Sequence, residues 1–136
     1  MSGERDLDTL LRTMSPELQD GVFVFCTLSA GDAMAAMLSP LMLFREREGD
    51  TLIVRREDAE RAGLAYRFTS RLITLSVLSA LDAVGFLARV TAALAAAGIS
   101  VNAVSAFHHD HLFVPEAQAE QAMRVLEEMS RRAAVG

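Results

Sequence analysis

The sequence contains no lysine, so all 13 of its basic residues are arginines. The 18 acidic residues outnumber them, the formal net charge is -5, and the arginines are scattered along the chain. A surface that binds nucleic acid or an anionic membrane needs positive charge gathered in one place. The composition therefore predicts neither a nucleic acid nor a membrane among the partners of this protein.

Cysteine and long apolar runs are also scarce. The single cysteine, Cys26, excludes a disulfide framework, and its apolar neighbours predict a buried core thiol. The first residues lack the basic and apolar regions of a signal peptide, and no apolar run approaches the roughly 18 residues that a membrane span needs. We therefore expect a cytoplasmic protein.

The sequence does contain an internal repeat. The segment Asp50–Ala62 aligns with Asp110–Ala122, sixty residues further on. The two segments are identical at the positions of Asp50, Leu52, Val54, Ala59, Glu60 and Ala62. Either half of a 136-residue chain would bury little surface alone. We therefore expect two copies of one unit that share a core, copy one at residues 1–69 and copy two at residues 70–136.

Copy one begins with apolar residues at helical spacing, which predict a leading helix over residues 7–14. Apolar runs and turn residues predict the elements that follow. These are a buried strand at 22–28, a short helical stretch at 33–38, strands at 41–47 and 51–55 joined as a hairpin, a helix at 57–62 and a closing strand at 65–69.

Copy two repeats this order with longer elements. The pattern predicts a strand at 73–77, a helix at 83–97 with Asp82 as its N-cap, strands at 99–107 and 111–114, and a last helix from Pro115 onward. Two such copies indicate an α+β protein with a mostly antiparallel, ferredoxin-like sheet. The chain ends before copy two supplies a closing strand, so we expect the copies to complete each other and the open edge to favour a homodimer.

All three histidines lie together, in His108-His109-Asp110-His111. Imidazole and carboxylate groups can bind a metal, so a metal-dependent or general-base enzyme that uses His109, Asp110 and His111 is one hypothesis. Alternating side chains on an extended segment let at most two of them share a face. A solvated polar hairpin and a ligand pocket lined by His109 or His111 are the alternatives. The sequence has no Gly-x-Ser-x-Gly nucleophile elbow, and we predict no catalytic residue and no cofactor.

The segment Ser79-Ala80-Leu81-Asp82-Ala83-Val84-Gly85-Phe86 joins the strand at 73–77 to the helix that follows. Free backbone N–H groups at a helix N-terminus attract an anionic group such as an amino-acid carboxylate. The structural alternative is an N-cap at Asp82 with Gly85 allowing close helix packing. The pattern by itself leaves both interpretations open.

Three segments together resemble an ACT domain: Leu81–Val90, Leu94–Asn102 and His109–Pro115. The particular similarity is to small bacterial proteins with two ACT units, which are similar to the CASTOR-type amino-acid sensors. The resemblance implies a pseudo-symmetric pair of βαββαβ units with helices on one face of the sheet. It also implies a non-catalytic module that binds a small ligand, usually an amino acid, at the interface between paired units.

The resemblance further implies which residues contact the ligand. They lie in the loop after the first strand of copy two, on the facing second strand, in the equivalent region of copy one and in the hairpin. They are Ser79, Leu81, Asp82, Val84, Gly85, Asn102, Ala103, Val104, Thr27, Ser29, Asp110 and His111. Helix N-terminal amides and Asn102 would hold the ligand carboxylate, and Asp82 or Asp110 the ammonium. No metal is expected.

The expected partners are an amino-acid ligand, a second copy of the chain, and an enzyme or transcription factor that the protein regulates. A protein-interaction module with a closed pocket is the remaining alternative.

Overall fold

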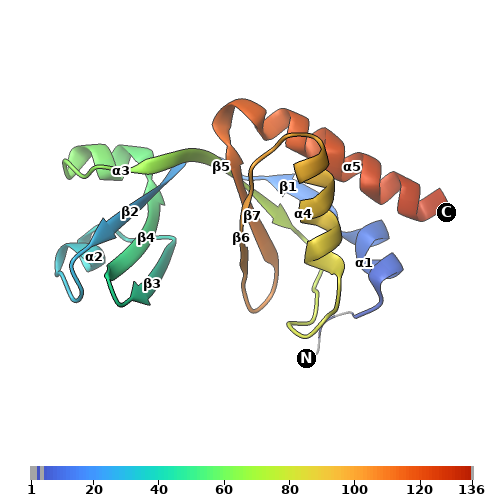
Figure 1. Cartoon of the computed structure of the whole chain (residues 1–136), viewed down its shortest axis with the longest axis horizontal. Helices are drawn as coiled ribbons and strands as arrows, with labels where there is room; N and C mark the ends of the chain where they lie inside the picture. Colours follow the sequence, from blue (N-terminus) through green and yellow to red (C-terminus); the bar gives the residue numbers. More distant parts are fainter. Residues whose placement is uncertain (1–2, 4, 136) are drawn as a thin grey trace. The chain divides into compact units, whose positions relative to one another are not determined.

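The computed structural model describes residues 3 and 5–135, and the chain divides into two compact units. The central unit is Gly21–Ser70, and the terminal unit combines residues 1–20 with residues 71–136. Both units contain strands and helices (Figure 1). The predicted α+β class is therefore confirmed.

The central unit corresponds to copy one without its leading helix. Its elements are β2 (Phe23–Leu28), α2 (Met34–Met37), β3 (Met42–Glu46), β4 (Gly49–Arg55), α3 (Arg56–Arg61) and the first residues of β5 (Arg67–Leu75). The strands lie in the order β3-β4-β2-β5 and pair antiparallel. The predicted buried strand and the hairpin that follows it are confirmed.

The terminal unit contains copy two together with the N-terminal segment. Its elements are α1 (Leu7–Thr13), β1 (Pro16–Leu18), the last residues of β5, α4 (Phe86–Ala96), β6 (Asn102–Ser105), β7 (Asp110–Pro115), the 3-10 turn η1 (Glu116–Gln118) and α5 (Ala119–Val135). The strands β5, β7 and β6 are neighbours in that order, and β1 pairs antiparallel with β5.

The closing strand of copy two comes from the N-terminal segment, within residues 1–69, so the expectation that the copies complete each other is confirmed. Strand β1 pairs with β5 in the register Pro16↔Leu75 and Leu18↔Ile73. In the central unit, β5 pairs with the first strand, β2. In the terminal unit the first strand is β5 itself, and β1 pairs with it in the equivalent way. Since β1 is only three residues long and begins with proline, no periodic pattern marks it as a strand.

The strands predicted at 65–69 and 73–77 form one continuous strand, β5. The polar residues between them are both bonded to backbone. The buried Ser70 hydroxyl donates to the Phe23 carbonyl at 2.9 Å, and Arg71 Nη2 donates to the Gln19 carbonyl at 3.0 Å. These bonds compensate burial of the Ser70 hydroxyl and of one Arg71 nitrogen. Arg71 Nε, by contrast, is buried and has no hydrogen-bond partner among the described residues.

The leading helix α1 packs in the terminal unit rather than with residues 21–69. Its apolar side chains Leu10, Leu11 and Met14 are buried in the same core cluster as residues of α4, β7 and α5. The Asp6 carboxylate caps α1 by accepting a hydrogen bond from the Thr9 N–H at 3.0 Å. This hydrogen bonding, together with that of the Thr9 hydroxyl, lowers the pKa of Asp6.

Most identical positions of the repeat face the two cores, whereas Glu60 and Glu120 are exposed. Leu52 and its counterpart Leu112 are fully buried, and the exposed fraction of Ala59 and of its counterpart Ala119 is at most 2%. Cys26 lies in the core of the central unit, as predicted, and burial raises the pKa of its thiol. The repeat is therefore explained by the same inward-facing pattern in each unit.

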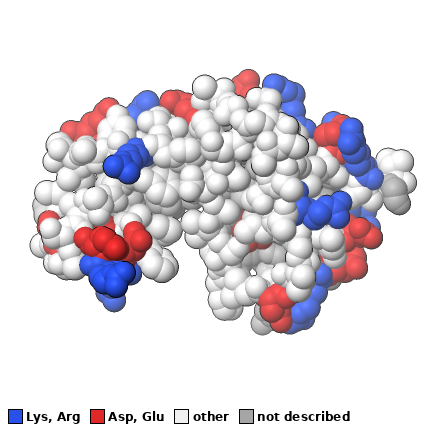
Figure 2. All heavy atoms as spheres, viewed as in Figure 1, with Lys and Arg blue, Asp and Glu red and all other residues white. Residues whose placement is uncertain are grey.

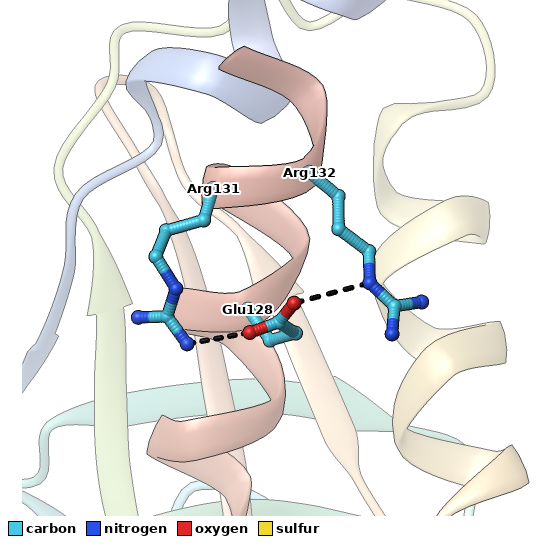
Figure 3. Close-up of polar contacts among 3 residues, drawn as sticks. All are labelled: Glu128, Arg131 and Arg132. Atoms are coloured by element: carbon cyan, nitrogen blue, oxygen red, sulfur yellow. Dashed lines mark hydrogen bonds and ion pairs between the residues drawn. The ribbon is translucent and has the colours of Figure 1, made fainter. Parts of the chain in front are cut away.

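The C-terminal end of α5 carries a small ion-pair network. Glu128 accepts hydrogen bonds from Arg131 Nη2 at 2.6 Å and from Arg132 Nε at 3.1 Å (Figure 3). Hydrogen bonding to these two guanidinium groups lowers the pKa of Glu128. The two arginines are thus engaged by one carboxylate, one turn earlier on the same helix.

Charged side chains of both signs are mixed on the face of the molecule shown in Figure 2. None of the helices within the described residues has the length and apolar character that crossing a membrane requires.

Candidate ligand-binding site

The loop between β5 and α4 differs from its prediction. Helix α4 begins at Phe86, after Gly85 with φ 90°, and no side chain caps its N-terminus. A left-handed backbone of this kind favours glycine. The predicted N-cap at Asp82 is therefore wrong, because the chain does not enter the helix until four residues later.

The Asp82 carboxylate instead binds Arg5, which is 77 residues away in the sequence. Arg5 Nε donates to Oδ1 at 3.0 Å, and Arg5 Nη2 donates to Oδ2 at 3.1 Å. Hydrogen bonding to Arg5 lowers the pKa of Asp82, and the same contact raises the pKa of Arg5. The two parallel bonds define how the N-terminal segment meets the loop.

Gly3 lies directly against the backbone of the same loop. A Cβ atom at this position would be 2.5 Å from both the Ala80 nitrogen and the Ser79 carbonyl carbon. Only glycine fits at such a separation without movement of the backbone. We call the described residues Gly3, Arg5 and Asp6 the N-terminal strap.

The strap and the loop border a cavity of about 360 Å³. Its lining combines two opposite charges with apolar side chains: Gly3, Arg5, Leu78, Ser79, Ala80, Leu81, Asp82, Phe107 and His108. This volume is at the small end of the range of about 300–1,000 Å³ that is usual for small-molecule sites. A smaller cavity of about 50 Å³ shares Ser79 and Leu81 and also contacts Asp110.

Asp110 is hydrogen-bonded to Ser79, a residue of the loop that lines the cavity. Its carboxylate accepts hydrogen bonds from the Ser79 hydroxyl at 3.0 Å and from the Ser105 hydroxyl, and the residue is 6% exposed. In the central unit the equivalent Asp50 accepts a bond from the Gly31 N–H at 3.3 Å. In both units, therefore, a buried aspartate of the repeat binds the loop that follows the first strand.

The histidines make separate contacts. His111 Nδ1 is hydrogen-bonded to the Thr74 hydroxyl at 3.0 Å, and His109 Nδ1 donates to the Val77 carbonyl at 3.3 Å. Burial, and then the charge of His109, lowers the pKa of His111. Within residues 3 and 5–135, no three His, Cys, Asp or Glu side chains are grouped so that they could hold a metal ion.

Several predicted site residues lie together in the terminal unit. Ser79, Leu81 and Asp82 line the cavity of about 360 Å³, and Asp110 is hydrogen-bonded to Ser79 of its lining. The side chain of Val84, in the same loop before Gly85, is 85% exposed.

The other predicted residues lie elsewhere. In β6, Ser105 pairs with Asp110, whereas Asn102 pairs with Phe113 at the opposite end of the strand, about 10 Å away. Ala103 is exposed and Val104 half-buried on the same strand, and His111 faces Thr74. Thr27 and Ser29 belong to the central unit, where both are exposed.

Sequence reasoning missed Gly3, Arg5, Leu78, Phe107 and His108 as cavity-lining residues. For Phe107 a signal existed, because a large aromatic residue beside a polar turn is a candidate binding residue; its side chain is 72% exposed. For Gly3 and Arg5 no local signal exists, because only the tertiary fold brings them to the loop.

The fold and this loop place the chain among α+β proteins built from two ferredoxin-like units in tandem. Two family models, both described as ACT domain, match residues 2–71 and 67–128. The chain belongs to the ACT domain family and contains two such domains, which are regulatory, non-catalytic modules. A comparison with curated proteins found no match.

Solved structures agree with this assignment. A Vibrio cholerae protein of unknown function, VC0802, described as a possible transport protein, is 43% identical with a TM-score of 0.84, over 91% of this chain and 95% of that one. Atu0741 from Agrobacterium tumefaciens is 19% identical, with a TM-score of 0.72, over 85% and 87% of the two chains.

The regulatory subunit of aspartate kinase from Thermus flavus is 12% identical, with a TM-score of 0.65, over 95% of this chain and 99% of that one. At this identity the similarity concerns the fold alone.

We predict that Asp110→Ala lowers the free energy of unfolding by about 1–3 kcal/mol, because the Ser79 and Ser105 hydroxyls lose a buried charged acceptor. Urea denaturation followed by circular dichroism measures this loss. Asp20→Ala, at an exposed acid of the same unit, is the matched control and should change little. An unchanged unfolding midpoint in Asp110→Ala would contradict the role assigned to this carboxylate.

A second prediction concerns the pH dependence of stability. Because the pKa of His111 in the folded state lies below its ordinary value of 6.5, the unfolded chain takes up the proton first as the pH falls. The stabilisation is therefore fully present above pH 6.5 and is lost as the pH falls through the folded pKa. Below pH 6.5, the free energy of unfolding of His111→Gln should therefore depend less on pH than that of the wild type. His108→Gln, which retains His111, should keep the wild-type slope; equal slopes in all three proteins would contradict the prediction.

Proposed function

We propose that this protein is a non-catalytic regulatory module that binds a small ligand, an amino acid, at the loop between β5 and α4. The observation that carries the proposal is the cavity of about 360 Å³ beside Ser79, Leu81 and Asp82. The ACT resemblance implies a ligand at this same loop. A cavity with both polar and apolar walls can bind a small molecule that has charged and apolar parts.

The contacts of the histidine cluster support a binding role over an enzymatic one. Asp110 is bonded to two serine hydroxyls, His111 to Thr74, and His109 to a backbone carbonyl. A metal-dependent or general-base site would need these groups to converge on one substrate atom. The open cavity likewise favours ligand binding over an interaction module with a closed pocket.

The similarity of fold to a regulatory subunit suggests what kind of partner this protein has. The Thermus flavus protein is a regulatory subunit, that is, a separate chain, of aspartate kinase. We propose that the present chain likewise acts on an enzyme or a transcription factor, to which it transmits the presence of its ligand.

We also propose a homodimer. Strand β1 occupies the edge that the sequence left open, whereas β3 is an end strand of the sheet order. Its Phe44 is 63% exposed and its Leu43 is 40% exposed. An unpaired strand edge that carries exposed apolar side chains favours pairing with a second chain.

Multi-angle light scattering at micromolar concentration tests the homodimer. We expect twice the 14.7 kDa of one chain, and a mass near one chain for Phe44→Glu, because a charge at the interface would be desolvated. Val135→Glu, at a side chain 90% exposed on α5, is the control and should remain dimeric. A monomeric wild type would contradict the proposal.

A thermal-shift screen against the twenty amino acids, with divalent metals in parallel, tests the ligand. One or a few amino acids should raise the melting temperature, because a ligand of the folded state stabilises it, by about 2.7 kcal/mol at a hundred times its Kd. Leu81→Trp, which adds volume to the cavity wall, should reduce the shift, whereas Val135→Trp should not. A response to metals alone, or to nothing, would contradict the proposal.

A further inference from the structure

The N-terminal strap contributes directly to the walls of the cavity. Gly3 and Arg5 line it together with the loop residues Ser79 to Asp82. The close approach of Gly3 to the Ala80 nitrogen fixes the strap against the loop backbone. Arg5 is therefore held beside the cavity by packing as well as by its ion pair.

The Arg5–Asp82 ion pair is accessible to water. The Arg5 side chain is 57% exposed and that of Asp82 is 71% exposed. Exposed ion pairs contribute little to stability, because water and salt screen both charges. A ligand that offers one charge of each sign can therefore replace the contact between these two residues with contacts of its own.

The geometry of the pair suits the two charged groups of a free amino acid. The guanidinium of Arg5 already donates two parallel hydrogen bonds to a carboxylate, that of Asp82. An amino-acid carboxylate can accept the same two bonds, and its ammonium group can donate to the Asp82 oxygens. These two side chains are the oppositely charged pair of the lining.

The groups that we expected to bind the ligand carboxylate, the N-terminal amides of the helix and Asn102, do not line this cavity. Helix α4 begins at Phe86, beyond the cavity-lining residues, and Asn102 lies at the end of β6 remote from Asp110. Arg5, by contrast, lines this cavity with a guanidinium group that can bind a carboxylate.

The rest of the lining restricts the side chain of the ligand. Leu78, Ala80, Leu81 and Phe107 are apolar, and the Phe107 ring contacts His108 at a centroid distance of 5.0 Å. A charged ligand side chain would lose water on this surface without gaining a partner of opposite charge. The lining therefore favours an uncharged, partly apolar side chain.

We propose that Arg5 and Asp82 form a charge clamp that recognises an α-amino acid with an uncharged side chain, Arg5 binding its carboxylate and Asp82 its ammonium. The strap is thus part of the ligand site. This inference rests on the proposed function and adds the ligand class and the residues that select it.

Isothermal titration calorimetry of the full chain with L-alanine, L-leucine, L-methionine and L-phenylalanine tests the clamp. At least one of these probes should bind. Its amide, which lacks the carboxylate charge, and its N-acetyl derivative, which lacks the ammonium, should each bind about tenfold more weakly or worse.

Arg5→Gln and Asp82→Asn should weaken binding of the same free amino acid by about tenfold or more, because each removes one charged contact. Arg5→Gln should also reduce the preference for the acid over the amide, and Asp82→Asn the preference for the free amine over the N-acetyl form. A purely structural role would change neither preference. Gly3→Ala should weaken binding with both charges retained, since its Cβ would displace the strap.

Arg131→Gln is the matched control, because Arg131 is also a surface arginine paired with a carboxylate, that of Glu128, and it does not line the cavity. It should bind as the wild type does. Unchanged affinity and preferences in Arg5→Gln and Asp82→Asn would overturn the clamp while ligand binding itself stands. Failure of all four amino acids to bind the wild type would overturn the clamp, and silence in the wider screen would overturn the proposed function too.

Discussion

The pairing of β1 with β5 is the interaction on which the candidate site depends. By placing Pro16–Leu18 beside Ile73–Leu75, it completes the sheet of the terminal unit with a strand from the opposite end of the sequence. The preceding helix α1 then buries Leu10, Leu11 and Met14 in the core of that unit. From there the strap, at Gly3 and Arg5, meets the loop between β5 and α4. The site thus combines residues of the N-terminal segment with residues of the loop that follows β5.

The aspartate of the repeat makes the same kind of contact in both ACT domains, but the loops that it binds lead into different helices. Asp50 and Asp110 both bind the loop that follows the first strand of their unit. In the central unit the loop leads into α2, a helix of only 4 residues. In the terminal unit it leads into α4, of 11 residues, and borders the cavity of about 360 Å³. The two units therefore differ in the segment after the first strand, although an aspartate binds the loop in both.

Sequence patterns predicted the buried strand at Phe23–Leu28, the two hairpins and the buried face of α5 because these features depend on local periodicity. The ACT resemblance pointed to the loop after the first strand of copy two, and its residues Ser79, Leu81 and Asp82 line a cavity. The role of Asp82 as an N-cap was wrong because Gly85, with its left-handed backbone, ends the loop later than a capping aspartate would. Asn102 lies at the far end of β6 from Asp110, because the register of β6 on β7 pairs Asn102 with Phe113 and Ser105 with Asp110.

By itself, the sequence determined that this is an α+β protein with two related units, because inward-facing positions such as Leu52 and Leu112 repeat in a regular pattern that each core requires. Only the tertiary structure decided which unit the N-terminal segment completes and that Arg5 meets Asp82. Both are contacts between residues far apart in the chain: β1 is too short to carry a periodic signal, and a single arginine can pair with any exposed carboxylate that the fold brings within reach.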